Sequence, residues 1–350
     1  MSLHTLKPRS QAVAITMGDP SGIGPEIIIK AFALSPELTQ GCCVFGDVPT
    51  LQSQLNQLAP LLPRHLECVS VRDVAQAGQS LAHQIPVIQC GPSHAIAMGQ
   101  VSAQAGAMAA AAIRSATQAA FIGEVAAIVT APLNKKALQL SGEAFPGHTE
   151  MLQSLAADHL GLPVSRLPVR MMLSCPGLRV VLVSIHVPLR EAIEAVTQEN
   201  VLQTFQVTHD SWLQLYGYAP RMSVAGLNPH AGEEGLFGEE EIRFISPAIE
   251  KAQALGLNVR GPYPPDTVFM HAHSQQGQKD IDVVVAMHHD QGLIPVKFLG
   301  LEEGVNQTLG LPFVRTSPDH GTAFDIAGKG LADSRSLLAA LKVANHHPHS

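Results

Sequence analysis

The sequence predicts a two-lobed α/β protein built on a mostly parallel sheet, and three observations lead to this prediction. Its 350 residues exceed what a single hydrophobic core usually serves. Hydrophobic residues make up 46% of the chain but aromatic residues only 4%, so the core must consist mainly of small aliphatic side chains. Short apolar runs alternate with longer helical stretches, which is typical of parallel strands covered by helices.

The order of these runs defines the expected elements. Strand-like runs cover residues 12–16, 42–45, 126–130, 169–173, 178–185, 222–227 and 281–286. Helical stretches cover residues 27–34, 49–58, 102–120, 151–160, 191–216 and 239–255. Residues 60–95 are interrupted by prolines and predict edge strands and loops. The alternation of strands and helices favours βα units.

Composition excludes several classes of protein. The net charge of −7 and the lack of lysine and arginine clusters argue against a nucleic-acid partner. No apolar run approaches the length of a membrane span, and the N-terminus has no signal core. Five cysteines without a C-x-x-C pair favour a reducing compartment. We therefore expect a soluble, cytoplasmic protein, with a solvated tail at His346, His347 and His349.

A glycine-rich loop follows the first strand. Residues 18–26 read GDPSGIGPE, and Pro25 suits the first turn of the next helix because its missing N–H costs nothing there. The loop is not a dinucleotide fingerprint, since a third glycine would be needed where Ile27 stands. By itself the loop predicts a structural turn between a strand and a helix.

Three histidines follow strand-like runs directly or within a few residues. They are His186, His230 and His289. Ligands collect at the carboxyl ends of strands in α/β sheets, and three converging imidazoles can hold a divalent metal with an open position for substrate. The long separations match no known metal-binding spacing, so hydrogen-bonded polar histidines remain the alternative interpretation.

A second group of residues suits an anion or a hydroxyl group. His148 and Thr149 stand at the start of a predicted helix, where free backbone N–H groups favour phosphate. Lys297, Asn306 and Arg315 follow the last predicted strand. The alternatives are an ordinary N-cap by Thr149 and solvated loop cations at Lys297 and Arg315.

Two carboxylates are candidate catalytic groups. Asp290 adjoins His289, and Asp266 lies in a proline-rich stretch near the expected cleft. Either could orient an imidazole or act as a base, and a metal-bound hydroxide is a third candidate base. A capping or turn role is the other interpretation of Asp266.

Six motifs together resemble the 4-hydroxythreonine-4-phosphate dehydrogenase family of vitamin B6 biosynthesis. They run in order from about residue 15 to 332: GDPSGIGPE (18–26), GHTE (147–150), LNPHAG (227–232), HDQG (289–292), VNQTLGLPF (305–313) and RTSPDHGTA (315–323). The glycine loop is also similar to that of isocitrate and isopropylmalate dehydrogenases.

The resemblance implies a fold of the isopropylmalate dehydrogenase type, with a cleft between two lobes. We expect one lobe from residues 1–134 with 292–350 and the other from residues 135–291. It further implies a homodimer with the active site at the subunit interface. It assigns the metal to His186, His230 and His289, the substrate to His148, Thr149, Lys297, Asn306 and Arg315, and the cofactor side to Asp319, His320 and Gly321. Residues 287–329 then form one wall of the cleft.

The resemblance also implies the chemistry. The expected cofactors are NAD, with NADP as the alternative, and one divalent ion (zinc, magnesium, manganese or cobalt), with three imidazoles favouring zinc or a later transition metal. The expected reaction oxidises 4-phosphooxy-L-threonine to 2-amino-3-oxo-4-phosphooxybutanoate, which decarboxylates to 3-amino-2-oxopropyl phosphate. Alternative substrates are D-threonate or D-erythronate 4-phosphate. An acyl-phosphate transferase or metal hydrolase on a similar scaffold is the alternative from another class.

Overall fold

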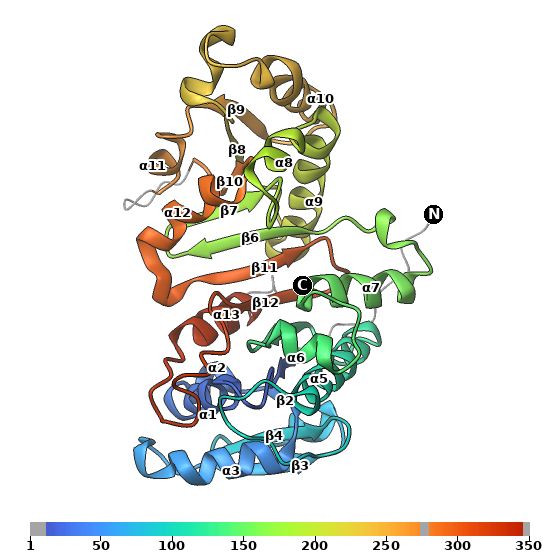
Figure 1. Ribbon diagram of the computed structural model, residues 1–350, viewed down its shortest axis with the longest axis vertical. Coiled ribbons are helices and arrows are strands. Elements are labelled where there is room, and N and C mark those ends of the chain that lie inside the picture. The colour runs from blue at the N-terminus through green and yellow to red at the C-terminus, as the bar shows by residue number, and fades with distance from the viewer. Residues whose placement is uncertain (1–11, 274–279, 346–350) are drawn as a thin grey trace. The chain divides into compact units, whose positions relative to one another are not determined.

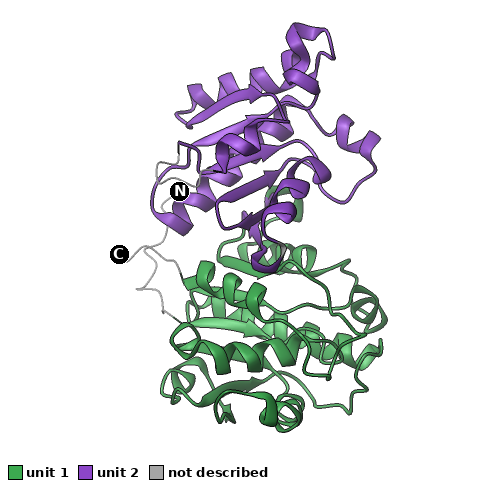
Figure 2. Ribbon diagram, turned by 90° about the vertical axis from the view of Figure 1, so that its left-hand side faces the viewer, with its two compact units in different colours: residues 1–166, 311–345 green, residues 167–310, 346–350 purple. Residues whose placement is uncertain are grey.

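The computed structural model describes residues 12–273 and 280–345, so the three tail histidines lie outside the described residues. It confirms an α/β fold with mostly parallel strands. The chain forms two compact units (Figure 2). Unit 1 comprises residues 1–166 and 311–345, and unit 2 comprises residues 167–310.

The strands of unit 1 are all parallel. Their order is β3 (Glu67–Val71), β4 (Gln84–Gln89), β2 (Cys42–Gly46), β1 (Val13–Thr16), β5 (Ala127–Thr130) and β12 (Val314–Pro318). Strands β1, β2 and β5 are buried at every position, as expected of central parallel strands covered on both faces. Within the proline-broken residues 60–95, β3 forms the edge of the sheet and β4 lies inside it.

Helices of unit 1 alternate with these strands. They are α1 (Gly24–Leu34), α2 (Pro36–Thr39), α3 (Val48–Leu58), η1 (Ala59–Leu61), α4 (Val74–Ala77), α5 (Ala103–Phe121), α6 (Lys135–Leu140), α7 (His148–Leu160), η2 (Val164–Arg166) and α13 (Arg335–Asn345). Side-chain oxygens of Asp47, Ser102 and Asn134 cap α3, α5 and α6 by accepting backbone N–H groups. The caps at Asp47 and Ser102 explain why α3 and α5 start within one residue of the predicted positions 49 and 102, whereas the sequence analysis did not predict α6.

Unit 2 mixes parallel and antiparallel strands. Their order is β11 (Val305–Leu309), β6 (Arg170–Cys175), β7 (Leu178–Leu182), β10 (Val283–Ala286), β8 (Met222–Ala225) and β9 (Val259–Tyr263). Strand β6 runs antiparallel to both of its neighbours, β11 and β7, and lies beside them in Figure 1. The other neighbouring pairs in this unit are parallel.

The helices of unit 2 differ from the prediction within residues 191–216, and the sequence analysis also predicted no helix over residues 268–272 or 289–300. They are α8 (Leu189–Glu194), α9 (Gln198–Tyr216), η3 (Pro229–Gly235), η4 (Glu241–Ile245), α10 (Ser246–Ala254), α11 (Val268–Ala272), α12 (His289–Gly300) and η5 (Leu301–Glu303). The single helix predicted over residues 191–216 is wrong. The Thr197 side chain accepts the Asn200 N–H at 3.2 Å and so starts α9 as a separate helix after α8. No helix in the described part of the chain is long and apolar enough to cross a membrane.

The unit boundaries lie later in the chain than the expected 134/135 and 291/292. Helix α6 stays with unit 1 because it packs closely on α5, where a Cβ at Gly106 would lie 2.0 Å from the Ala137 carbonyl oxygen. Helix α7 also stays there, since His159 stacks on Phe121 of α5 with ring centroids 4.0 Å apart. Residues 292–310 belong to unit 2 because α12 packs on β7 and β11 pairs with β6.

Candidate functional site

The three candidate metal histidines follow neighbouring parallel strands of unit 2. Strand β10 lies between β7 and β8 and is parallel to both, so the carboxyl ends of all three strands meet at one edge of the sheet. His186 follows β7, His230 follows β8, and His289 begins α12 after β10. The strand positions read from the sequence therefore bring these segments to a common edge.

His186 and His289 lie close together at this edge. Their ring centroids are 5.5 Å apart. Both line a pocket of about 220 Å³, together with Ile185, Val187, Leu189, Ala192, His288 and Asp290. The His289 Nδ1 lies 2.7 Å from Asp290 Oδ1, and this hydrogen bond lowers the pKa of Asp290. The carboxylate thus fixes the imidazole and leaves Nε2 as the ring nitrogen for a cation.

His230 has a different environment. Its Nδ1 lies 2.8 Å from Glu233 Oε2, and its ring meets the edge of Phe237. Residues 230–234 form a left-handed turn, with φ angles of 52°, 53°, 83°, 44° and 56°. Each non-glycine residue in this conformation costs on the order of 1 kcal/mol, and such strain is often found at functional sites.

A buried carboxylate holds the base of this strained turn. Glu241 Oε1 accepts the backbone N–H groups of Leu227 at 2.7 Å and Asn228 at 2.8 Å. Its Oε2 accepts from the Asn228 side chain at 2.9 Å. Glu241 is 3% exposed. The sequence analysis missed Glu241. Nothing in the sequence distinguishes this residue from other residues of the helical stretch in which it lies.

Gln291 joins the strand ends that carry the histidines. Its Oε1 accepts the Met287 N–H at 2.7 Å, and its Nε2 donates to the Gly226 carbonyl at 2.6 Å. The side chain therefore links the carboxyl end of β10 to that of β8. The sequence analysis missed this role, although Gln291 lies inside the HDQG motif and could have been examined there.

These observations define what the edge can hold. Two imidazoles and a neighbouring carboxylate are donors that suit a divalent transition-metal ion. Among the described residues, no group of three or more His, Cys, Asp or Glu side chains is arranged to hold a metal ion. The structure brings His186 and His289 together and does not add His230 to them, so the three-histidine metal site stays a prediction.

Asp266 follows β9, the outermost strand of unit 2, at the same edge of the sheet. It is an exposed residue in the turn between β9 and α11, next to Thr267 at the N-cap position of α11. Strand β9 is parallel to β8. This placement agrees with the turn interpretation of Asp266, while its catalytic role stays a prediction.

His148 is the first residue of α7 in unit 1. The N-cap residue is Gly147, which gives no side-chain cap, so the alternative of an N-cap by Thr149 is wrong. The His148 Nε2 is buried and has no hydrogen-bond partner among the described residues. Burial, with a contribution from the charges of Arg315 and Lys135, holds the pKa of His148 well below its usual value. The imidazole is therefore neutral.

Arg315 lies within β12 and is 4% exposed, so the alternative of a solvated loop cation is wrong for this residue. Its Nη2 donates to Thr130 Oγ1 at 2.7 Å. Burial lowers the pKa of Arg315 to about 10, against an opposing effect of the Glu150 charge. The guanidinium thus remains protonated at neutral pH beside a neutral imidazole.

Lys135 is a further cation near this place that the sequence analysis did not select. A Cβ at Gly147 would lie 3.5 Å from Lys135 Cε, and the Lys135 charge contributes to the lowered pKa of His148. The sequence could have indicated Lys135, because this residue follows shortly after the buried strand β5. The start of α7, Arg315 and Lys135 together form what we call the anion-binding cluster of unit 1.

The remaining predicted substrate residues lie in unit 2. Lys297 is exposed on α12, so it lies on a helix and not in a loop. Asn306 lies in β11, opposite Leu173 of β6. The five predicted substrate residues are thus divided, with His148, Thr149 and Arg315 in unit 1 and Lys297 and Asn306 in unit 2.

The glycine loop of unit 1 meets the segment that follows β12. Strands β1 and β12 flank β5 and are both parallel to it, so their carboxyl ends lie at one edge. The Ile23 N–H donates to the Thr322 carbonyl at 3.0 Å, and a Cβ at Gly22 would lie 2.9 Å from Thr322 Cβ. Gly22 is therefore required for this close approach, which gives the loop a packing role beyond a simple turn.

Buried polar atoms collect in this loop. Asp19 is fully buried, and its Oδ1 accepts the Ser21 N–H at 2.8 Å. Burial raises the pKa of Asp19 against the opposing hydrogen bond from the Ser21 backbone N–H. Asp19 Oδ2 and Ser21 Oγ have no hydrogen-bond partner among the described residues. Such atoms are uncommon in folded proteins and indicate a place where a ligand or water binds.

The predicted cofactor residues stand beside this loop. The Asp319 N–H donates to Ser336 Oγ at 3.2 Å, which joins the segment to the start of α13. His320 is exposed, and a Cβ at Gly321 would meet nothing within 4 Å. The unpartnered Asp19 Oδ2 and Ser21 Oγ could bind hydroxyl groups of a ligand, and the cofactor role of residues 319–321 stays a prediction.

Comparison with known proteins identifies the family. The family model of the pyridoxal phosphate biosynthetic protein PdxA matches residues 39–344. The chain therefore belongs to the PdxA family, as its motifs predict, and it is a dehydrogenase of the PdxA type.

Individual relatives agree with this assignment. A 4-hydroxythreonine-4-phosphate dehydrogenase of Beijerinckia indica is 46% identical, over 95% of this chain and 94% of the relative. A D-threonate 4-phosphate dehydrogenase of Salmonella typhimurium is 45% identical, over 96% of this chain and 98% of the relative. The crystal structure of a 4-hydroxythreonine-4-phosphate dehydrogenase from Klebsiella pneumoniae has a TM-score of 0.84 at 44% identity, covering 96% of this chain and 98% of its own.

Proposed function

We propose that this protein catalyses the NAD-dependent, divalent-metal-dependent oxidation of 4-phosphooxy-L-threonine to 2-amino-3-oxo-4-phosphooxybutanoate. This product then loses carbon dioxide to give 3-amino-2-oxopropyl phosphate, which places the enzyme in pyridoxal phosphate biosynthesis. Membership of the PdxA family supports the proposal, as do relatives that are named for this substrate.

The observation that carries the proposal is the anion-binding cluster of unit 1. A buried, protonated Arg315 provides the strong charge, and the unpartnered Nε2 of a neutral His148 provides a hydrogen-bonding group. The first backbone N–H groups of α7, at His148 and Thr149, complete the donors. We propose that they bind the substrate phosphate, with Lys297 and Asn306 of unit 2 as further substrate-binding residues.

His186, His230 and His289 are the proposed metal ligands. When bound, a divalent ion acts as a Lewis acid on the substrate hydroxyl and lowers its pKa. Zinc or a later transition metal suits imidazole donors best, with magnesium, manganese and cobalt as alternatives. Asp290 holds the His289 ring in the orientation that leaves Nε2 for the ion.

The two carboxylates are proposed for different roles. Asp290 Oδ1 lies 2.7 Å from His289 Nδ1, and this hydrogen bond occupies the carboxylate and lowers its pKa. We therefore favour an orienting role for Asp290. Asp266 remains the carboxylate proposed as general base, with a metal-bound hydroxide as the alternative.

NAD is proposed to bind beside Asp319, His320 and Gly321, with NADP as the alternative. When bound, NAD would supply the hydride acceptor for the oxidation of the substrate. These residues of unit 1 would bind and align the cofactor. The exposed His320 and the open side of Gly321 support this location.

We further propose a cytoplasmic homodimer. Ile294 and Phe298, one turn apart on α12, are 64% and 89% exposed, and large exposed apolar side chains are typical of subunit interfaces. The five cysteines are free, and burial raises the pKa of Cys42 and Cys43 to about 12, so these thiols suit a reducing compartment.

D-threonate 4-phosphate is the second candidate substrate, and D-erythronate 4-phosphate is closely related to it. Both carry a hydroxyl group where 4-phosphooxy-L-threonine has an amine. Relatives named for D-threonate 4-phosphate and for 4-hydroxythreonine 4-phosphate are 45% and 46% identical to this chain, so similarity favours neither. Membership of a dehydrogenase family leaves the acyl-phosphate transferase or metal hydrolase alternative without support.

An NADH absorbance assay tests the proposal. The protein is treated with a chelator, then assayed with NAD and each of the three acid phosphates, with and without added zinc, cobalt, manganese or magnesium. We expect NADH formation only with metal, and the highest kcat/KM with 4-phosphooxy-L-threonine. Full activity without metal would refute the metal role, and a higher kcat/KM with D-threonate 4-phosphate would replace the proposed substrate.

A further inference from the structure

Two charged side chains of α1 form a buried ion pair. Glu26 and Lys30 are one helical turn apart, and Lys30 Nζ lies 2.9 Å from Glu26 Oε1. The Glu26 side chain is 0% exposed and that of Lys30 is 17% exposed. Burying two charges costs several kcal/mol per ion, which the pair recovers only through good geometry and further hydrogen bonds. The partners of this pair therefore indicate its role.

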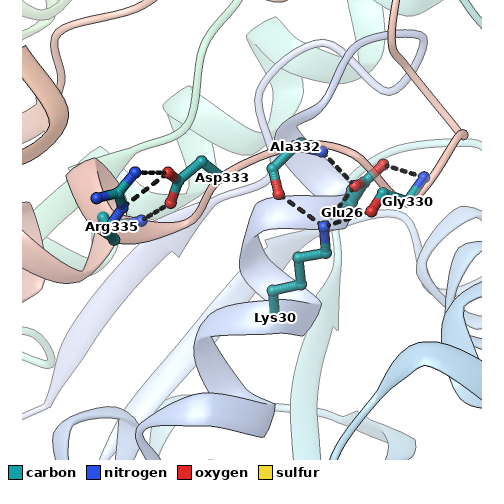
Figure 3. A network of polar contacts seen from close by, with 6 residues as sticks. All are labelled: Glu26, Lys30, Gly330, Ala332, Asp333 and Arg335. Carbon is teal, nitrogen blue, oxygen red and sulfur yellow. Dashed lines mark hydrogen bonds and ion pairs between the residues drawn. The ribbon is translucent and has the colours of Figure 1, made fainter.

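Those further partners are main-chain groups of one short segment, residues 330–332 (Figure 3). Glu26 Oε1 accepts the Ala332 N–H at 2.7 Å, and Glu26 Oε2 accepts the Gly330 N–H at 3.2 Å. Lys30 Nζ donates to the carbonyl oxygens of Gly330 at 2.9 Å and Ala332 at 2.6 Å. With Glu26, these two carbonyls use all three ammonium protons. The ion pair thus holds both polar groups of two residues in place.

The same helix also holds the other end of this segment. Ile23, immediately before α1, donates its N–H to the Thr322 carbonyl at 3.0 Å. Residues 322–332 are therefore attached to α1 near both ends and form no long helix or strand between them. The predicted cofactor residues, 319–321, immediately precede the first attachment.

We propose that Glu26 and Lys30 are positioning residues for the dinucleotide. They contact no reacting atom, and they act by holding residues 322–332 in the conformation that presents Asp319, His320 and Gly321 to NAD. This inference rests on the proposed location of NAD in unit 1. A loop that is ordered before binding loses less conformational entropy when the ligand arrives, so the ion pair raises affinity for the cofactor.

Substitutions in the pair test this role. Glu26→Gln keeps the shape of the side chain but removes the charge that accepts the two N–H groups. Lys30→Gln is the milder change, and it carries the test if Glu26→Gln loses its cooperative unfolding transition. Asp333→Asn is the control, because Asp333 forms the neighbouring exposed ion pair with Arg335 and leaves the four main-chain bonds intact (Figure 3).

The readouts are NADH affinity by fluorescence titration, KM for the phosphorylated substrate, and hydrogen exchange over residues 322–332. If the competent loop population falls to roughly a tenth, the NADH Kd rises about tenfold in the pair variants. We expect KM for the phosphorylated substrate to change less than twofold and amide exchange in the segment to accelerate. Asp333→Asn should leave NADH affinity within twofold of the wild-type value.

Two results would overturn this inference while leaving the proposed cofactor location intact. One is unchanged NADH affinity in a variant whose segment exchanges faster. The other is an equal loss of NADH and substrate binding, which a general structural role would produce. If wild-type protein fails to bind NADH at all, the proposed cofactor location fails and the inference fails with it. The wild-type titration therefore distinguishes the two failures.

Discussion

Lys135 and Lys136 are adjacent exposed residues at the start of α6, yet they differ in their surroundings. Lys135 comes near Gly147 at the start of α7, and its charge contributes to the low pKa of His148. Burial is the larger cause of that low pKa, so His148 contributes a hydrogen bond and not a charge. Within unit 1, positive charge for the proposed substrate phosphate would therefore come from Arg315 and from Lys135.

We predict that Lys135→Gln weakens phosphate binding. A charge-assisted hydrogen bond contributes about 1.5–3 kcal/mol when buried, and an exposed lysine contributes less, so KM for the phosphorylated substrate should rise roughly threefold to tenfold. Inhibition by inorganic phosphate should weaken by a similar factor. Steady-state kinetics with and without inorganic phosphate measure both effects.

Lys136→Gln is the matched control for this prediction. It removes the same charge from the same helix one residue later, so a general electrostatic effect would change both variants alike. We expect its KM to stay within twofold of the wild-type value. Equal effects in the two variants would show that Lys135 does not contact the phosphate.

Helix α12 places His289, because this histidine is its first residue. The helix lies against the sheet of unit 2 at Gly292. A Cβ there would lie 2.5 Å from Leu182 Cδ2, 2.8 Å from Val180 Cγ1 and 3.1 Å from Ala286 Cβ. A glycine at this position therefore lets the helix approach β7 and β10 closely enough to bring His289 near His186.

We predict that Gly292→Ala displaces α12 and weakens metal binding. Overpacking costs about 1–3 kcal/mol, and the gain in helix propensity offsets roughly 1 kcal/mol of it, so the free energy of unfolding should fall by up to about 2 kcal/mol. Denaturant unfolding measures the stability, and metal titration measures the affinity. Gly300→Ala at the other end of α12, where the nearest atom is Cys175 Cβ at 3.3 Å, should change neither by much.

An ion pair joins the residues that immediately precede β8 and β10 in the same sheet. Arg221 Nε lies 2.9 Å from Asp282 Oδ2, and the Arg221 backbone N–H also donates to that carboxylate. Burial alone would raise the pKa of Asp282, but these hydrogen bonds outweigh burial and lower it below its ordinary value of 3.8. The ion pair thus links stability to pH in the acidic range.

We predict that Asp282→Asn loses stability mainly above pH 4. A lowered pKa in the folded state means that the stabilisation is fully present above the unfolded pKa and is lost as the pH falls through the folded pKa. The Arg221 side chain is 44% exposed, so solvent screening limits the effect at neutral pH to about 1 kcal/mol. Thermal unfolding from pH 7 down to pH 2 should show the variant and wild-type curves converging. A constant difference across this range would contradict the prediction.

At the scale of the whole molecule, the proposed functional residues are divided between the two units. The anion-binding cluster and the proposed cofactor segment lie in unit 1. The three proposed metal-binding histidines and Lys297 lie in unit 2. Lys297 shares α12 with the exposed apolar residues Ile294 and Phe298. A second subunit covering this face would therefore bury apolar surface directly beside a proposed substrate residue.

We predict that Phe298→Asp converts a dimer into monomers. The side chain is 89% exposed, so its replacement should leave the stability of the single subunit nearly unchanged, whereas a charge inside an apolar interface costs several kcal/mol. Light scattering measures the mass, and activity should fall with dimerisation if the site is shared. Leu255→Asp, at the exposed end of α10, is the control. A monomeric wild-type protein would contradict the homodimer proposal.

The sequence by itself determined the fold class and most of the elements. Periodicity and helix caps depend on neighbouring residues, so the βα alternation and the strand-end positions of His186, His230 and His289 could be read directly. The motifs also identified the family, because their order along the chain is preserved. The break before α9 was missed, since Thr197 looks like any polar residue until its side chain accepts the Asn200 N–H.

Only the tertiary structure decided which of these residues meet. It placed His186 beside His289 and paired His230 with Glu233, and it buried Arg315 in a strand where the sequence allowed a loop. It also assigned residues 135–166 and 292–310 to their units, through contacts such as Gly106 with Ala137 and Gly292 with Val180. The physical reason is that burial, pKa and close packing depend on residues distant in sequence. Local patterns therefore locate the strand ends but do not determine what surrounds them.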